Sequence, residues 1–164
     1  AFPGPGLHAP DYHVSEVMDE LFSGMSSNLF ERVREQKSLA YFVRSSRIVG
    51  LDTGMFYFFA GTSPQRYGEV IEELNLEIAR VQGGGVTAEE LARCQTRLKA
   101  GKRMGMQTNS ARAMQSALNA VYGLPVNDWR TYDARIDAVT LADAQAFARR
   151  YFQPASRVQL VVKP

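Results

Sequence analysis

The sequence has few of the residues from which metal sites and disulfides are built. Among its 164 residues there are one cysteine, Cys94, and two histidines, His8 and His13. A single cysteine excludes a disulfide within the chain. No apolar stretch reaches the roughly 18 residues that a membrane-spanning helix needs, so no membrane span is expected. We expect a soluble chain, in the periplasm or the cytoplasm if its source is bacterial.

The sequence also lacks a strong charge of either sign. Its 19 basic and 17 acidic residues leave a formal net charge of +2, and the basic residues are scattered along the chain. Binding to nucleic acid would need basic residues clustered with aromatic ones, so no nucleic-acid partner is expected. Repeats, low-complexity tracts and linkers are missing as well. The length and composition predict a single domain over residues 1–164.

Hydrophobic spacing predicts many helices and a few strands. Apolar residues three and four apart indicate helices near residues 11–24, 63–83, 88–106, 111–122, 129–138 and 140–151, with a shorter one near 26–35. Consecutive apolar residues indicate strands at Leu39–Val43, Gly54–Thr62 and Val158–Val162, the first two joined by a long hairpin. This order predicts an α+β fold of two layers, with helices packed on one face of a mostly antiparallel sheet. The strand over Gly54–Thr62 is apolar on both faces, so we expect another domain over the second face.

Polar residues mark the expected starts and ends of several helices. Thr87 followed three residues later by Glu90 predicts a capping box at the start of the longest helix. Ser63 before Pro64 predicts another helix start, because proline fits the first helical position. The glycines at residues 83–85 follow a helix rather than a strand, which indicates a helix end and not a phosphate-binding loop.

The histidines do not form the pattern that zinc-peptidase chemistry requires. That chemistry needs two imidazoles one helical turn apart and a carboxylate that takes a proton from bound water. His8 and His13 are five residues apart, and neither H-E-x-x-H nor H-x-x-E-H occurs. The segment from His13 to Val17 matches the second motif except at its last position. We expect no metal site in this chain and an exposed His13 at a helix start.

The remaining candidate pair is Arg34, at the end of the short helix, and Tyr41, at the start of the next strand. A guanidinium and a phenol offer only donors to an oxyanion at neutral pH. They suit stabilisation of the charge on a carbonyl oxygen under attack, provided that another part supplies the attack. Strand alternation predicts that Tyr41 and Val43 point to the same side. The alternative, from chemistry alone, is a surface arginine and a half-buried tyrosine of the sheet.

The segment around this pair, SNLFERVREQKSLAY at residues 27–41, resembles a signature of the pitrilysin/insulinase family of zinc metallopeptidases. The signature is that of the family's C-terminal, zinc-less domain. Other segments are similar to the same domain and follow in the same order, at residues 10–12, 21–24, 61–64, 86–91, 137–140 and 158–162. The resemblance therefore covers nearly the whole chain.

The resemblance implies the half-domain fold of insulinase and mitochondrial processing peptidase, in which two similar halves close around a peptide. One half carries H-x-x-E-H and zinc, and the half that this chain resembles has lost both. Ser15, Met18 and Asp19 align with the lost ligand and base positions. Arg34 and Tyr41 match the family's substrate contacts near the zinc of the other half, so we expect them to contact the substrate or the transition state.

The sequence departs from the family pattern at two positions, and the resemblance also implies partners. Asn28 stands where the family usually has arginine, and Ser38 where it has glycine, so the turn before Tyr41 is expected to differ in shape. The resemblance implies a zinc-bearing half, linked or separate, and a peptide substrate, with zinc in that other half and no cofactor in this chain. We also expect a fragment that lacks one or two leading strands.

Three functions fit these observations. The first is the non-catalytic half of a zinc metalloendopeptidase, which binds peptide and supplies Arg34 and Tyr41 to the active site. The second is a catalytically silent scaffold or assembly subunit of the same family. The third is a free-standing peptide-binding module. The chain alone is expected to be inactive in all three.

Overall fold

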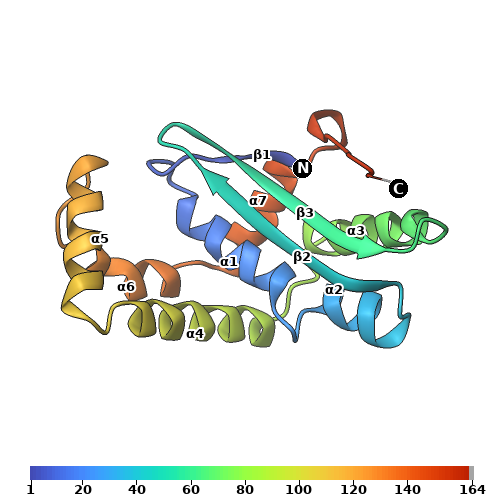
Figure 1. The fold of residues 1–164 in the computed structure, drawn as a ribbon, viewed down its shortest axis with the longest axis horizontal. Coiled ribbons are helices and arrows are strands. Elements are labelled where there is room, and N and C mark those ends of the chain that lie inside the picture. Colours follow the sequence, from blue (N-terminus) through green and yellow to red (C-terminus); the bar gives the residue numbers. More distant parts are fainter. Residues whose placement is uncertain (163–164) are drawn as a thin grey trace.

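The computed structural model describes residues 1–162, with three antiparallel strands lying across a layer of helices (Figure 1). In chain order the elements are β1 (Phe2–Pro5), α1 (Tyr12–Ser23), α2 (Asn28–Phe30), the π-helix η1 (Glu31–Gln36), β2 (Ala40–Val49), β3 (Thr53–Thr62), α3 (Tyr67–Gln82), α4 (Ala88–Gly105), α5 (Asn109–Val121), the 3₁₀ helix η2 (Asp128–Thr131), α6 (Tyr132–Asp137), α7 (Leu141–Tyr151) and the 3₁₀ helix η3 (Pro154–Ser156). The α+β class, with helices packed on one face of an antiparallel sheet, is confirmed.

The sheet has the strand order β1-β3-β2, so β2 lies at one edge. The turn between β2 and β3 spans only residues 50–52, whereas a long hairpin was predicted. The difference arises because β2 continues to Val49, six residues beyond the predicted end. Its polar residues Ser45 and Arg47 face polar side chains of α1, so this half of the strand needs no apolar run.

Strand β1 forms from a proline- and glycine-rich segment that the sequence does not mark as a strand. It pairs antiparallel with β3, with Gly4 opposite Gly54 and Pro5 opposite Thr53. The two chains approach closely here: a Cβ on Gly54 would lie 2.4 Å from the carbonyl oxygen of Pro5. Glycine is therefore required at position 54. Because Gly4 has no side chain, β1 shows no hydrophobic periodicity in the sequence.

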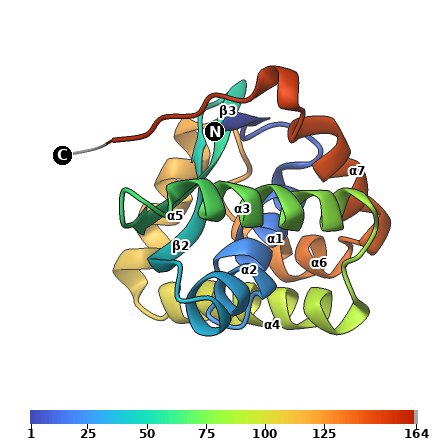
Figure 2. The same ribbon diagram turned by 90° about the vertical axis from the view of Figure 1, so that its right-hand side faces the viewer.

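The predicted strand at Val158–Val162 is wrong, because these residues carry no strand assignment. One pair reaches the sheet: the Val158 N–H donates to the Ala1 carbonyl at 2.9 Å, and the Ala1 amino group donates back at 2.8 Å. Figure 2 shows this segment running out past the N-terminus, away from the helices.

The predicted helix starts and ends differ in accuracy. The capping box of Thr87 and Glu90 is confirmed at the start of α4. The start at Ser63 is wrong: residues 63–66 form a turn, closed by a hydrogen bond from Arg66 N to Ser63 O, and α3 begins at Tyr67. The helix predicted at residues 129–138 is divided into η2 and α6. The longest helices were located correctly because their apolar stripes face the core.

The core lies between α1, α7 and the inner face of the sheet, which is the face that these helices cover in Figures 1 and 2. Phe22, Phe56 and Phe152 are its centre, with ring centroids 5.0–6.3 Å apart. Edge-to-face contacts of this kind add to the stabilisation that comes from burying the rings. The inner face of β2 and β3 is thereby fixed against the helices, and the strand ends next to α2 are held in place.

Candidate functional site

The corner between η1 and β2 holds the predicted pair. Ser27 is the N-cap of α2, and its hydroxyl accepts a hydrogen bond from the Phe30 N–H at 3.1 Å. The chain then widens into the π-helix η1, in which the Lys37 N–H donates to the Arg32 carbonyl five residues earlier. Widened turns of this type often occur at functional sites. Arg34 lies in this widened turn, two residues before its end at Gln36.

Arg34 lies between two aromatic rings. Its guanidinium carbon is 5.1 Å from the ring centroid of Phe30 and 5.8 Å from that of Tyr41. Both distances are within the range of a cation–π interaction, which restrains the guanidinium without using its N–H donors. Within residues 1–162, only a 3.7 Å ion pair with the exposed Glu35 competes for those donors. The structure therefore brings Arg34 and Tyr41 together, with donors facing solvent.

Tyr41 is placed by a β-bulge rather than by regular strand alternation. The pairing of β2 with β3 shifts register between Ala40, opposite Thr62, and Phe42, opposite Gly61. Tyr41 is the extra residue, and it is 83% exposed while Val43 is buried. The prediction that Tyr41 and Val43 point to the same side is therefore wrong. Bulges redirect side chains in this way, and this one points the phenol out of the sheet.

A charge network around two buried carboxylates anchors η1 to α3. Arg32 donates to Glu73 at 2.5 Å and to Glu77 at 3.2 Å, and Lys37 donates to Glu73 at 2.5 Å. The hydrogen bond from Lys37 holds the pKa of Glu73 below its ordinary value, with help from Arg32 and against the effect of burial. Buried carboxylates are tolerated when they are paired in this manner. Arg32 thus fixes the same turn that presents Arg34.

The two departures from the family pattern have structural roles. The Asn28 side chain donates to Glu90 at 2.8 Å and so links α2 to the start of α4. Ser38 has a φ of +46°, a left-handed conformation that glycine adopts more readily than serine. The turn before Tyr41 therefore keeps a glycine-like backbone although it contains serine.

The positions aligned with the lost metal ligands contain a hydrogen-bonded cluster of the chain's own side chains. Ser15 and Met18 are fully buried in α1. Arg47 of β2 donates to the Ser15 hydroxyl at 2.7 Å, and its Nε lies 3.9 Å from Asp19. The Asp19 carboxylate also accepts a 2.6 Å hydrogen bond from the Ser45 hydroxyl. A half-buried guanidinium that contacts these groups repels a metal cation, and the residues do not fit zinc.

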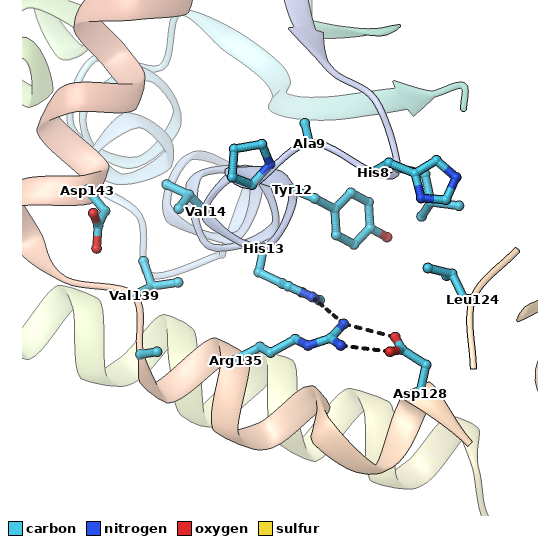
Figure 3. A pocket seen from close by; sticks show the side chains of 13 residues that line it. His8, Ala9, Tyr12, His13, Val14, Leu124, Asp128, Arg135, Val139 and Asp143 are labelled. Carbon is cyan, nitrogen blue, oxygen red and sulfur yellow. Dashed lines mark hydrogen bonds and ion pairs between the residues drawn. The ribbon is translucent and has the colours of Figure 1, made fainter. Parts of the chain in front are cut away.

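A cavity of about 520 Å³ lies elsewhere, between the start of α1 and the η2–α6 segment (Figure 3). His13 points into it and is half-buried, not exposed as predicted, with Nδ1 2.9 Å from Glu16. Its Nε2 is 3.4 Å from the guanidinium of Arg135, which is paired bidentately with Asp128 at 2.7 and 2.9 Å. His13, Arg135 and Asp128 are thus already paired with one another or with Glu16. Arg34 and Tyr41 are not part of its lining.

Residues 1–162 contain no group of three or more histidine, cysteine, aspartate or glutamate side chains arranged for a metal ion. Cys94 is buried in α4, and burial raises the pKa of its thiol to about 12, so it is a poor nucleophile or ligand at neutral pH. Over the same residues, no helix is both long and apolar enough to cross a membrane.

Several solved structures have a similar fold. A protease from Helicobacter pylori superposes with a TM-score of 0.84 at 22% identity, over 94% of this chain and 38% of that one. An inactive peptidase domain from Bordetella parapertussis superposes with a TM-score of 0.78 at 14% identity, over 96% of this chain and 90% of that one. A chain of complex III2 from Candida albicans gives 0.79 at 18% identity, over 92% and 38%. These likenesses establish that the chain has the fold of these domains.

Sequence comparison identifies the family. A model of the family described as Peptidase M16 inactive domain matches residues 1–98, and the chain belongs to that family. An uncharacterized zinc protease of Streptomyces coelicolor, SCO5738, is 32% identical over 151 residues. The alignment covers 88% of this chain and 32% of that protein, so the chain spans about a third of the relative's length.

Sequence reasoning found Arg34 and Tyr41 through the family pattern and missed the residues around them. Phe30, which stacks under the guanidinium, lies four residues before Arg34, a spacing that places two side chains on one helix face. That spacing was visible in the sequence. The pairing of Arg32 with Glu73 and Glu77 was not, because the partners are more than forty residues apart.

Proposed function

We propose that this chain is the non-catalytic half of a zinc metalloendopeptidase, which binds peptide and supplies Arg34 and Tyr41 to an active site completed by a zinc-bearing half. One observation carries the proposal: the corner holds a guanidinium and a phenol side by side, both exposed, and within residues 1–162 the guanidinium has only a 3.7 Å ion pair with the exposed Glu35. The anchoring of η1 through Arg32 supports it, because a contact that stabilises a transition state must be preorganised.

In this role the two side chains act on a carbonyl oxygen of the peptide. The metal of the other half supplies the activation of water. The Arg34 guanidinium and the Tyr41 hydroxyl donate hydrogen bonds to the oxygen as negative charge develops on it. Phe30 and Tyr41 hold the guanidinium in place without consuming those donors.

The test is turnover of the complete enzyme, with both halves present. Arg34→Ala and Tyr41→Phe are each expected to lower kcat by about 100-fold or more, since removing one such donor typically costs that much. Thermal unfolding should be nearly unchanged because both side chains are exposed at the surface. Arg130→Ala and Tyr122→Phe are matched controls far along the chain, in η2 and at the end of α5. Unchanged kcat in both test variants would mean that Arg34 and Tyr41 are surface residues without a catalytic role.

A second candidate is a catalytically silent assembly subunit, which the likeness to a chain of complex III2 supports. A scaffold has no need of two free donors at an exposed corner. Mixing the chain with an H-x-x-E-H-bearing partner separates the two functions. Zinc-dependent cleavage that requires both proteins supports the peptidase half, and stable assembly without turnover supports the scaffold.

A further inference from the structure

The loop between η1 and β2 is fastened to the segment that follows β3. The Thr62 hydroxyl donates to the Leu39 carbonyl at 2.5 Å, and the Arg66 guanidinium donates to the Ser38 carbonyl at 3.1 Å. The two donors lie 23 and 28 residues further along the chain, where β3 ends and the turn to α3 begins. Two consecutive carbonyls ahead of Tyr41 are therefore each held by a side chain from a distant segment.

The backbone that these hydrogen bonds hold departs from regular geometry at two residues. Ser38 has its φ of +46° in the left-handed region. The register of β2 against β3 shifts between Ala40 and Phe42, so Tyr41 lies in a bulge outside the regular ladder. Backbone of this kind persists where the surrounding groups over-determine it, and it clusters at functional sites.

Strand β3 holds the chain on both sides of Tyr41. On one side, the ring of Phe42 occupies the space of a side chain at Gly61, where a Cβ would lie 2.6 Å from the ring. On the other side, Thr62 reaches the carbonyl of Leu39. A bulge redirects the side chain of its extra residue, and these two contacts set the direction.

The Tyr41 phenol has no directed bond of its own. It is exposed, and within residues 1–162 its hydroxyl makes no hydrogen bond. Its ring lies 5.8 Å from the guanidinium carbon of Arg34 and 6.4 Å from the ring centroid of Phe42. Because these contacts fix the ring only loosely, the position of the hydroxyl follows the backbone that carries it.

Arg66 is itself oriented by an ion pair. Its Nε and one terminal nitrogen each lie 3.2 Å from a carboxylate oxygen of Glu69. Bidentate pairing of this type fixes the plane of the guanidinium, and the other terminal nitrogen is left to donate to the Ser38 carbonyl. This contact is longer and more exposed than that of the half-buried Thr62, so we expect Thr62 to have the larger effect.

We propose that Thr62 and Arg66 are positioning residues, which hold the bulge so that the Tyr41 hydroxyl reaches the carbonyl oxygen of a bound peptide. The inference rests on the proposed function for the role of Tyr41, and it adds two side chains that act through Tyr41 without touching the substrate. A donor to the transition state must be placed accurately, because a misplacement of about 1 Å can cost ~100-fold in rate.

Turnover of the complete enzyme, with both halves present, tests this role. Thr62→Val keeps the shape of the side chain and removes the donor, so kcat is expected to fall about 10-fold while KM stays nearly unchanged. Thr62→Ser retains a hydroxyl and should keep most of the wild-type kcat. Arg66→Ala should lower kcat by less than Thr62→Val does.

Thr131→Val is the matched control. The Thr131 hydroxyl also donates to a backbone carbonyl, that of Asp128 at 2.8 Å, but it lies in η2, away from the corner. This variant should leave kcat unchanged. Thermal unfolding checks that every variant is folded at the assay temperature, and Thr62→Ser and Arg66→Ala keep the test decisive if Thr62→Val does not fold.

A double-mutant cycle separates positioning from a general structural role. In Tyr41→Phe the hydroxyl that Thr62 positions is absent, so adding Thr62→Val should lower kcat no further. An equal loss in both backgrounds would overturn the inference, because Thr62 would then act on another part of the protein. A wild-type kcat in Thr62→Val, beside an impaired Tyr41→Phe, would overturn it as well.

A second measurement follows Tyr41 without turnover. In the full-length protein labelled with fluorotyrosine, the Tyr41 signal is the fluorine resonance that Tyr41→Phe removes. Thr62→Val is expected to shift or broaden this resonance, whereas Thr62→Ser and Thr131→Val should leave it in place. An unmoved resonance in Thr62→Val would contradict the inference whatever happens to kcat.

Failure of the proposed function looks different from failure of the inference. Normal turnover in Tyr41→Phe contradicts the catalytic role of Tyr41, while a fluorine resonance that depends on the Thr62 hydroxyl still supports the positioning. Impaired turnover in Tyr41→Phe together with a resonance that ignores Thr62 supports the catalytic role and overturns the positioning.

Discussion

The two faces of the β2–β3 hairpin are made by the same strands and have opposite chemistry. On the inner face, Arg47 is half-buried and bonded to Ser15 and Glu16 of α1. Three residues earlier, on the outer face, Arg44 is exposed and has no partner within residues 1–162. One arginine is part of the fold, and the other is not.

The same contrast occurs in η1. Arg32 is paired with Glu73 and Glu77. Within residues 1–162, Arg34, two residues later, contacts only aromatic rings and the exposed Glu35. In both places a structural arginine fixes the backbone from which its neighbour extends. Within one element, different side chains therefore serve stability and binding, so substitutions can test the two roles separately.

The largest expected effect comes from comparing the same substitution, phenylalanine to alanine, on the two faces of the hairpin. Phe56→Ala, on the inner face, is expected to lower the free energy of unfolding by about 3–5 kcal/mol, because it leaves a cavity in a core that cannot collapse fully. Phe59→Ala, on the outer face, is expected to cost about 1 kcal/mol or less, the value of a cross-strand contact. Urea unfolding measures both. Similar losses in the two variants would mean that the outer face is also part of the core.

A second effect, of intermediate size, is the loss of folding stability at acidic pH. The folded-state pKa of Glu73 lies below its ordinary value, so the stability that it contributes is present above pH ~4.3 and is lost as the pH falls through the folded pKa. Glu73→Gln is expected to lower the free energy of unfolding at pH 7 by about 1.5–3 kcal/mol. It should also flatten the decline in stability below pH ~4.3.

Denaturation at a series of pH values from 7 to 3 checks this behaviour. Glu72→Gln is the matched control, because Glu72 is the exposed neighbour on α3. An acid decline that is as steep in Glu73→Gln as in the wild type would show that the charge network does not anchor η1.

The smallest expected effect sharpens the comparison at the corner itself. Ser38→Gly should stabilise the protein by about 0.5–1 kcal/mol, because glycine adopts the left-handed conformation of residue 38 without steric strain. Part of this gain is offset because glycine loses more conformational entropy on folding than serine does. Ser110→Gly, in the helix α5, should have the opposite sign. Thermal unfolding distinguishes them, and a destabilising Ser38→Gly would mean that the serine side chain, not its backbone, holds the turn.

The elements predicted most accurately are those whose signals are local. The capping box of Thr87 and Glu90 uses residues three positions apart, so the sequence displays it directly. β1 was missed, since its proline and glycine residues resemble a loop until Gly54 is placed opposite them. The extension of β2 was missed because its inner polar residues are explained only by α1.

The candidate site divides in the same way. The family pattern and the spacing of Arg34 and Tyr41 were available from the sequence, and so was the loss of the metal-binding histidines. The orientation of Tyr41 was not, because a bulge shifts the register at one residue and cancels the simple alternation of a strand.

By itself the sequence determined the composition of the site, the helices that carry it and the absence of an H-x-x-E-H motif, all of which follow from short-range spacing. Only the tertiary structure decided which arginines are free. That choice depends on carboxylates contributed by α1 and α3, and on which side of a twisted hairpin the helices pack. Contacts between distant segments have no periodicity of their own, so they become visible only when the chain is folded.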